Sequence, residues 1–142
     1  MATIELVSAE LLDNEKLQQV VSFLPRNSQV RSNSAFQMTL AQRYFPEIYQ
    51  LSEWIGTLGL GVQGNNVTLL NIQPIGYNSI PLSHTRPIAI VPIDPVSFRS
   101  SSGLVVLAGP GALVKTSPAS PASETKAVDS LDAQGARLLL IY

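Results

Sequence analysis

The sequence contains no cysteine, a single histidine and few charged residues. Asp, Glu, Lys and Arg make up 13% of its 142 positions, against roughly 25% in typical globular proteins. Without cysteine the chain has no disulfide, no thiolate nucleophile and no sulfur-ligated metal site. The net charge is −1, and the nine Lys and Arg residues are scattered along the chain. Because nucleic-acid binding usually leaves a patch of basic residues, we expect no nucleic-acid partner.

Long apolar runs are missing as well. No stretch of the sequence approaches the roughly 18 consecutive apolar residues of a membrane-spanning helix. The N-terminal segment MATIELVSAELL lacks the basic region followed by an apolar run that marks a signal peptide. We therefore expect no membrane partner and no cleaved leader.

The apolar content, in contrast, is that of a folded protein. Hydrophobic residues make up 45% of the sequence, and this content with a low net charge is not typical of disordered chains. A chain of this length is expected to form a single domain, residues 1–142. With so few charged side chains, we expect much of the surface to be either neutral and polar or covered by other chains.

Residues from about 9 to 58 show the periodicity of amphipathic helices. The apolar positions of the segment 17–24 recur at intervals of three and four, as they do on one face of a helix. Asp13 is suited to cap this helix, and Pro25 is suited to end it. The sequence therefore predicts an amphipathic helix in the first quarter of the chain.

A second helical region is predicted from residue 35 onward. Ser34 and Gln37 have the spacing of a capping box, so we expect a helix over 35–45. Pro46 is well placed as the first residue of a further helix, whose apolar residues repeat every three or four positions up to Leu58. This region also holds a cluster of aromatic residues that we expect to pack in the core: Tyr44, Phe45, Tyr49 and Trp54.

After residue 60 the pattern changes to short apolar runs that are rich in β-branched residues and bounded by Gly, Pro, Asn and Ser, which is typical of strands. The predicted strands lie within residues 65–75, 86–94, 103–109 and 136–142. Pro92 lacks the backbone donor of a sheet ladder, so an edge position or a bulge is expected there. The run Leu104–Leu107 does not alternate with polar residues, which predicts burial on both faces.

The segment of about 115–135 is rich in Ser, Pro and Ala, and we expect it to form an extended arm before the C-terminal strand. Together these features predict an α+β fold. In this fold, N-terminal helices over about 9–58 pack on a mainly antiparallel, Pro-interrupted β-sheet formed by residues 66–142.

Gly59, Gly61 and Gly64 have the G-x-G-x-x-G spacing of dinucleotide-binding proteins. That site requires a strand before the glycines, a helix after them, and an acidic residue about 20 positions further on. Here a predicted helix precedes the glycines and a predicted strand follows them, and the segment around position 84 has no Asp or Glu. We therefore interpret the glycines as the turn between helix and sheet, and expect no cofactor.

No group of residues forms an evident catalytic constellation. His84 lies beside Ser83 in a polar segment without a nearby carboxylate, so the parts of a catalytic triad are not assembled in the sequence. The ten acidic residues gather mostly near the two ends of the chain, which leaves no evident carboxylate pair or metal site. Gly109–Gly111 lacks the Lys-Ser/Thr of a phosphate loop and is expected to be a turn. We expect no catalytic, cofactor-binding or metal-binding residues.

These features favour a non-enzymatic structural or assembly subunit. By analogy of composition, we expect a virion component of a tailed bacteriophage, either a capsid cement (decoration) protein or a head–tail connector, assembled in the host cytoplasm. Its partners would be copies of itself and other structural subunits, contacted through the sheet and the 115–135 arm. Two alternatives stay open: an adaptor or ligand-binding module of a cellular complex, and a small hydrolase that uses His84.

Overall fold

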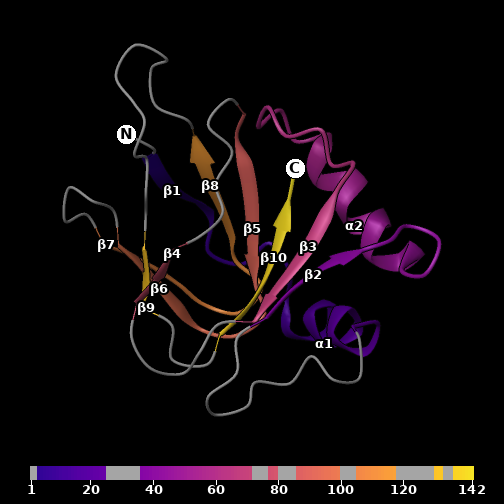
Figure 1. Ribbon diagram of the computed structural model, residues 1–142, viewed down its shortest axis with the longest axis horizontal. Coiled ribbons are helices and arrows are strands. Elements are labelled where there is room, and N and C mark those ends of the chain that lie inside the picture. The colour runs from indigo at the N-terminus through magenta and orange to yellow at the C-terminus, as the bar shows by residue number, and fades with distance from the viewer. Residues whose placement is uncertain are drawn as a thin grey trace.

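The computed structural model describes residues 3–24, 36–71, 77–79, 86–99, 105–117, 130–132 and 136–142. Within these ranges the chain forms two antiparallel sheets and two short helices (Figure 1). The larger sheet has six strands in the order β1 (Thr3–Ser8), β8 (Leu113–Ser117), β5 (Ile88–Pro92), β10 (Arg137–Ile141), β3 (Val67–Asn71) and β2 (Phe36–Leu40). The smaller sheet has four strands in the order β4 (Tyr77–Ser79), β9 (Ser130–Asp132), β6 (Val96–Arg99) and β7 (Val105–Ala108).

From β3 onward the chain passes back and forth between the two sheets. Strands β3, β5, β8 and β10 belong to the larger sheet, and β4, β6, β7 and β9 belong to the smaller one. All pairings between the described strands are antiparallel. Two four-stranded layers connected in this way form a jelly roll, or double-stranded β-helix. Strands β1 and β2 extend the larger layer by one strand at each edge.

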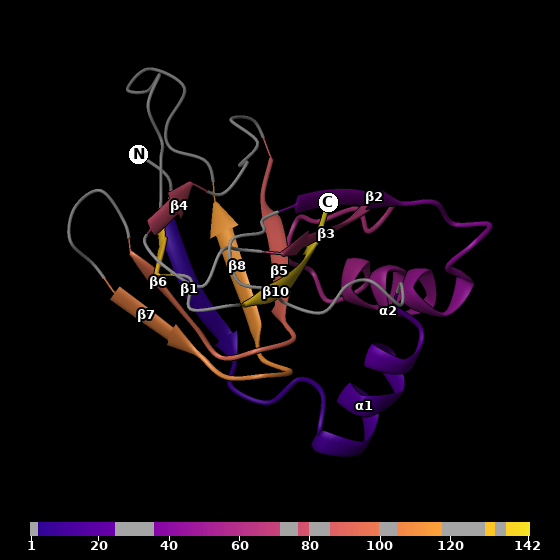
Figure 2. The same cartoon turned by 60° about the horizontal axis from the view of Figure 1, so that its bottom comes forward.

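Both helices begin as the sequence predicts. α1 (Asn14–Ser22) follows Asp13, whose carboxylate accepts a 2.8 Å hydrogen bond from the backbone N–H of Lys16 and so caps the first turn. α2 (Pro46–Gly56) starts at Pro46. Proline lacks a backbone N–H, but in the first turn of a helix this group has no partner within the helix, so no hydrogen bond is lost. The helices cover the outer face of the larger sheet, which therefore lies between them and the smaller sheet (Figure 1 and Figure 2). Neither helix, among the described residues, is long and apolar enough to cross a membrane.

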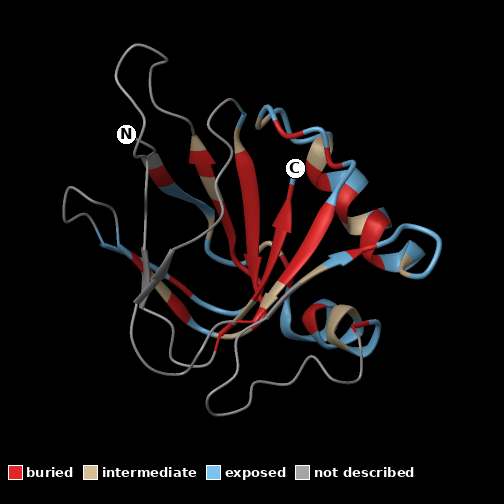
Figure 3. Cartoon of the chain, in the orientation of Figure 1, coloured by how far each residue is buried: buried red, intermediate tan, exposed pale blue. Residues whose placement is uncertain are grey.

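The larger sheet is buried on both faces because its strands present alternate side chains to two separate cores (Figure 3). Along β10, Leu138 and Leu140 pack in the core between the sheets, whereas Leu139 and Ile141 pack in the core beneath the helices. Each large aliphatic side chain buried in this way stabilises the fold by about 1.5–3 kcal/mol. Burial on both faces explains why the strand sequence RLLLI contains no alternation of apolar and polar residues.

The predicted α+β fold, with helices over 9–58 packed on a sheet over 66–142, is wrong. The protein is mostly β, and two of its strands, β1 and β2, lie in the part of the chain expected to precede the sheet. β1 pairs with β8, and β2 pairs with β3. β1 and β2 therefore belong to the larger sheet instead of covering it. Of the described part of the region predicted to be helical, only α1 and α2 are helices that cover the sheet.

The helix predicted over 35–45 is a strand for a physical reason that local spacing does not reveal. Met38 packs against the core beneath the helices and Leu40 is buried in it, whereas the intervening Thr39 is exposed; this is the period of two that a strand requires. β3 offers an edge whose backbone groups need partners, and pairing with it outweighs the capping-box spacing. Ser34 and Pro25 lie outside the described residues.

The four strand predictions in the second half are confirmed as β3, β5, β7 and β10, but three details are wrong. Pro92 is neither at an edge nor in a bulge, since β5 lies between β8 and β10 and the proline is its last residue. The run containing Val105 and Leu107 is not buried on both faces, because both side chains are exposed. The segment 115–135 is not one arm, since β8 extends to Ser117 and residues 130–132 form β9; its other residues lie outside the described part.

Candidate functional site

The glycine motif joins α2 to β3 and serves helix packing. Gly59, Gly61 and Gly64 have φ angles of 76°, 79° and 79°. A Cβ on Gly64 would lie 2.4 Å from the carbonyl oxygen of Ser52 in α2, and the hydroxyl of Ser52 donates a 2.6 Å hydrogen bond to the carbonyl oxygen of Gly64. The prediction that a helix precedes the glycines and a strand follows them is confirmed. The order required for dinucleotide binding is therefore reversed.

Polar side chains gather at one end of the space between the two sheets. At this end β5 begins and β8 and β10 finish (Figure 1). Tyr142 follows β10 at this end, and its hydroxyl oxygen lies 3.1 Å from Oγ1 of Thr68 in β3. Thr116, near the end of β8, donates a 3.4 Å hydrogen bond to the carbonyl oxygen of Ile88. We refer to this end as the barrel mouth and to Thr68, Thr116 and Tyr142 as the mouth residues.

The strand register places the mouth residues on the inner face of the larger sheet. Thr68 and Thr116 each lie directly opposite an apolar residue of the core between the sheets, and directly opposed residues of antiparallel strands share a face. Backbone hydrogen bonds of 3.0 and 2.9 Å between Tyr142 and Asn66 extend the pairing of β10 and β3 beyond the strand end. Tyr142 comes two positions after Leu140, so it faces the same side of the sheet.

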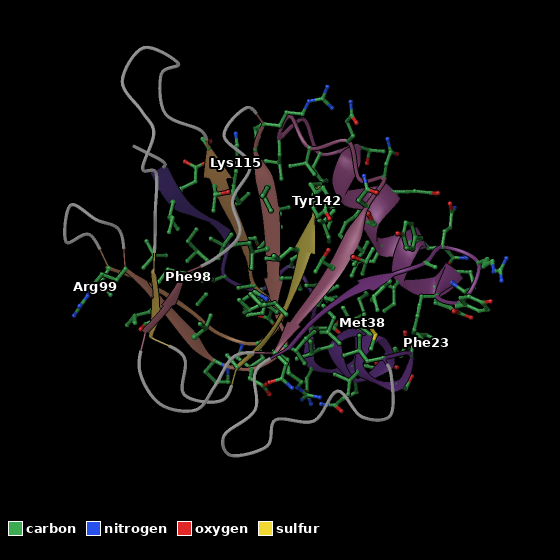
Figure 4. All side chains as sticks on the ribbon, viewed as in Figure 1. Phe23, Met38, Phe98, Arg99, Lys115 and Tyr142 are labelled. Atoms are coloured by element: carbon green, nitrogen blue, oxygen red, sulfur yellow. The ribbon has the colours of Figure 1, made fainter. Side chains whose placement is uncertain are left out.

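The three mouth residues differ in how far they are exposed to solvent. Thr68 and Thr116 are buried, whereas Tyr142 is 39% exposed at the end of β10 (Figure 4). Deeper in the sandwich the inner face is apolar, and Leu140 and Phe98 are fully buried there. The mouth therefore combines one partly exposed tyrosine, two buried threonines and an apolar floor.

The opposite end of the sandwich carries a charged pair. Arg137, the first residue of β10, donates hydrogen bonds from Nε and Nη2 to the carboxylate of Asp94 in the turn between β5 and β6. The two ends of the sandwich thus differ: the ion pair between Arg137 and Asp94 lies at one end, and the three mouth residues lie at the other.

The residues that the sequence singled out are not brought together in the described structure. His84 and Ser83 lie outside the described residues, so the hydrolase alternative is not tested by geometry. Gly109–Gly111 forms the turn between β7 and β8, as predicted. Within the ranges that the structure describes, no three His, Asp or Glu side chains are grouped so that they could hold a metal ion.

The aromatic cluster divides between core and surface. Tyr49 is buried and donates a 2.6 Å hydrogen bond from its hydroxyl to the carbonyl oxygen of Leu40, so the expected core packing is confirmed for this residue. It is wrong for Tyr44 and Trp54, which are exposed. Phe45 is half-buried against the core beneath the helices.

The mouth residues could not be found from sequence spacing. Thr68, Thr116 and Tyr142 come from three strands, and the first and the last are 74 positions apart. Isolated hydroxyl residues in apolar runs are common in strands, and none of the three belongs to a motif. Only the register of β3, β10, β5 and β8 brings them to one end of one face.

Comparison with known proteins gives information on fold but not on family. Neither a known protein family nor a curated protein matches the sequence. Among solved structures, the fold is similar to the crystal structure of a Pseudomonas putida prolyl-4-hydroxylase, with 14% sequence identity and a TM-score of 0.51. The match covers 98% of this chain and 89% of that chain. At this identity the similarity shows the jelly-roll fold alone.

This similarity corrects the expected class of protein. The matched structure, similar in fold over nearly the whole chain, is named as an enzyme and not as a phage structural protein. The predictions of a non-enzymatic subunit and of a capsid cement or connector protein are therefore wrong, and a location in the virion has no support. Association with copies of itself or with other subunits stays a prediction.

A hydroxylase fold raises the question of iron. Non-haem iron oxygenases bind their metal through two histidines and one carboxylate. This chain has a single histidine, and the side chains that gather at the barrel mouth are hydroxyls. The residues present therefore do not fit a two-histidine iron site.

Proposed function

We propose that this chain is an enzyme that binds its substrate at the barrel mouth, against Tyr142, Thr68 and Thr116. The observation that carries the proposal is the 3.1 Å contact between the hydroxyls of Tyr142 and Thr68 at the rim of an otherwise apolar interior. Ligand sites occur preferentially in the mouths of β-barrels, with a few polar groups in an apolar surround. The fold similarity to a hydroxylase supports an enzyme on this scaffold.

The chemistry of the mouth indicates the kind of substrate. A hydroxyl group both donates and accepts hydrogen bonds, so the three mouth residues suit a ligand with hydroxyl, amide or carbonyl groups. The apolar floor formed by residues such as Ile88 and Leu140 suits a ligand with one aliphatic face. Tyr142 is the accessible member of the group, and a tyrosine can transfer a proton as a general acid.

The reaction of the structural neighbour is not part of the proposal. Prolyl hydroxylation is named for the Pseudomonas putida protein, and the two-histidine iron site typical of non-haem oxygenases has no counterpart among the residues of this chain. The similarity extends to the fold and not to the reaction performed on it.

Binding at the mouth can be tested by nuclear magnetic resonance on the full chain. ¹⁵N-labelled protein is titrated with N-acetylprolinamide, glucose and lactate, which offer amide, hydroxyl and carboxylate groups on small aliphatic frames. We expect at least one probe to shift the backbone signals of Thr68, Thr116 and Tyr142. Saturable shifts confined to other residues, or no shift with any probe, would contradict the proposal.

Variants link the signal to the hydroxyl groups. Tyr142→Phe and Thr68→Val each remove one hydroxyl, and we expect the affinity for the probe to fall about 2–10-fold, the effect of about 0.5–1.5 kcal/mol from one hydrogen bond. Tyr44→Phe is the matched control, because Tyr44 is 65% exposed in the segment that precedes α2. Equal affinities in all three variants would argue against the mouth as the site.

A further inference from the structure

The described carboxylates do not reach the interior of the barrel. Asp94 accepts three hydrogen bonds from Arg137, from the backbone N, Nε and Nη2, at the end away from the mouth. Glu5 lies on β1 next to Ile4, which belongs to the core between the sheets, so Glu5 faces the other side of that strand. The exposed carboxylates are those of Glu5, Glu10, Asp13, Glu15, Glu47 and Glu53.

The interior itself is filled by side chains that cannot bind a metal ion. Ile90, Leu138 and Leu140 from the larger sheet and Phe98 from the smaller one are buried together. Hard cations take oxygen ligands, and the iron of non-haem oxygenases takes imidazole nitrogen and carboxylate oxygen. The mouth residues Thr68, Thr116 and Tyr142 offer hydroxyls, which lack the charge of a carboxylate and the basicity of an imidazole.

The ligand set of an iron oxygenase is also incomplete in the sequence. A two-histidine, one-carboxylate site cannot be built from a chain with one histidine, His84, wherever that residue lies. The remaining acidic residues are Glu124 and Asp129, which lie outside the described ranges, and Asp132, the last residue of β9. A histidine ligand for iron could come only from His84.

We infer that this protein has the fold of a hydroxylase but holds no resident iron, so that its barrel works through the hydroxyl groups of the mouth. The absence of resident iron follows from the side chains available as metal ligands and is independent of the proposed substrate site. The role of the mouth hydroxyls rests on the proposed function. A protein of this fold without iron would catalyse a reaction other than oxygen-dependent hydroxylation.

The test uses the full chain and measures iron instead of activity. The protein is stripped of metal with a chelator, mixed with Fe(II) without oxygen, desalted and analysed for iron by mass spectrometry. We expect far less than one iron atom per chain, with the same value for His84→Ala. Retention of one iron atom per chain by the unmodified protein would overturn the inference, and loss of that iron in His84→Ala would then identify His84 as a ligand.

A second measurement detects iron that binds the protein in solution but is lost during desalting. A metal that binds only the folded protein raises its unfolding temperature, so the melting curve is recorded with and without Fe(II). We expect no shift. A rise with Fe(II) that disappears in His84→Ala would overturn the inference, even if the desalted sample contains little iron. Neither result depends on the probes titrated at Tyr142, so failure here and failure of the mouth site can be distinguished.

Discussion

Arg137 and Asp94 are joined by three hydrogen bonds. The backbone N and side-chain Nε of Arg137 each donate to Oδ2 of Asp94 at 3.0 Å, and Nη2 donates to Oδ1 at 3.2 Å. The backbone N–H of Ile93 also donates to the carbonyl oxygen of Arg137 at 2.8 Å. The start of β10 is thereby attached to the turn that carries the chain from the larger sheet to the smaller one.

Replacing Asp94 by Asn removes the charge but keeps the shape, and we expect the free energy of unfolding to fall by about 1–3 kcal/mol. Hydrogen bonds to charged groups contribute about this much, and the pair is only partly exposed. Urea unfolding measures the change, and Glu53→Gln is the control because Glu53 is exposed on α2. Equal midpoints for the two variants would show that the pair contributes little.

Two glycines of the motif can be used to separate the two costs of replacing glycine by alanine: strain from a positive φ and a steric clash in packing. Gly59 and Gly64 both have positive φ, so alanine at either position costs about 1–3 kcal/mol. A Cβ at Gly64 would also approach the carbonyl oxygen of Ser52 to 2.4 Å, whereas at Gly59 it would meet nothing within 4 Å. We expect Gly64→Ala to be the more destabilising of the two by thermal unfolding. Similar melting temperatures would contradict a packing role for Gly64.

Two leucines test the assignment of inner and outer faces. Leu140 is 1% exposed between the sheets, and Leu107 is 71% exposed on β7. Leu140→Ala leaves a cavity, so we expect a loss of about 2–5 kcal/mol in the free energy of unfolding. Leu107→Ala is expected to change it by less than about 0.5 kcal/mol. A large fall in the free energy of unfolding for Leu107→Ala, measured at low protein concentration, would mean that another part of the same chain covers the outer face of β7.

Hydrogen exchange is expected to rank the strands of the larger sheet. β10 pairs with β3 and β5 and is buried on both faces, so its amides exchange only by large-scale opening. β1 pairs with β8 on one side only and has exposed residues at Glu5 and Leu6. We expect the amides of Leu139 and Leu140 to exchange more slowly than those of β1. Equal protection would contradict the edge position of β1.

The features predicted correctly from sequence depend on neighbours in the chain. The capping by Asp13 acts over three residues, and the role of Pro46 depends on its own missing N–H. The direction of the glycine motif, with a helix before Gly59 and a strand after Gly64, also follows from local patterns. Such signals do not need the rest of the molecule.

The features predicted wrongly depend on partners far along the chain. Phe36–Leu40 is a strand because β3 is available to pair with it. The apolar run of β7 has one exposed face because no element among the described residues covers it. The hydroxyls of Thr68 and Tyr142 meet only because β10 pairs with β3.

The sequence by itself determined the starts of α1 and α2, the four most apolar strands, the helix-to-strand order around the glycine motif and, through its composition, that only one histidine is available as a ligand. Only the tertiary structure decided that the strands form two sheets of a jelly roll and that the hydroxyls of Thr68 and Tyr142 meet at one end of it. The physical reason is that caps, turns and ligand identity are properties of short segments or of composition. Strand pairing, in contrast, depends on contacts between residues far apart in the sequence, and a change of register by one residue moves every side chain to the other face.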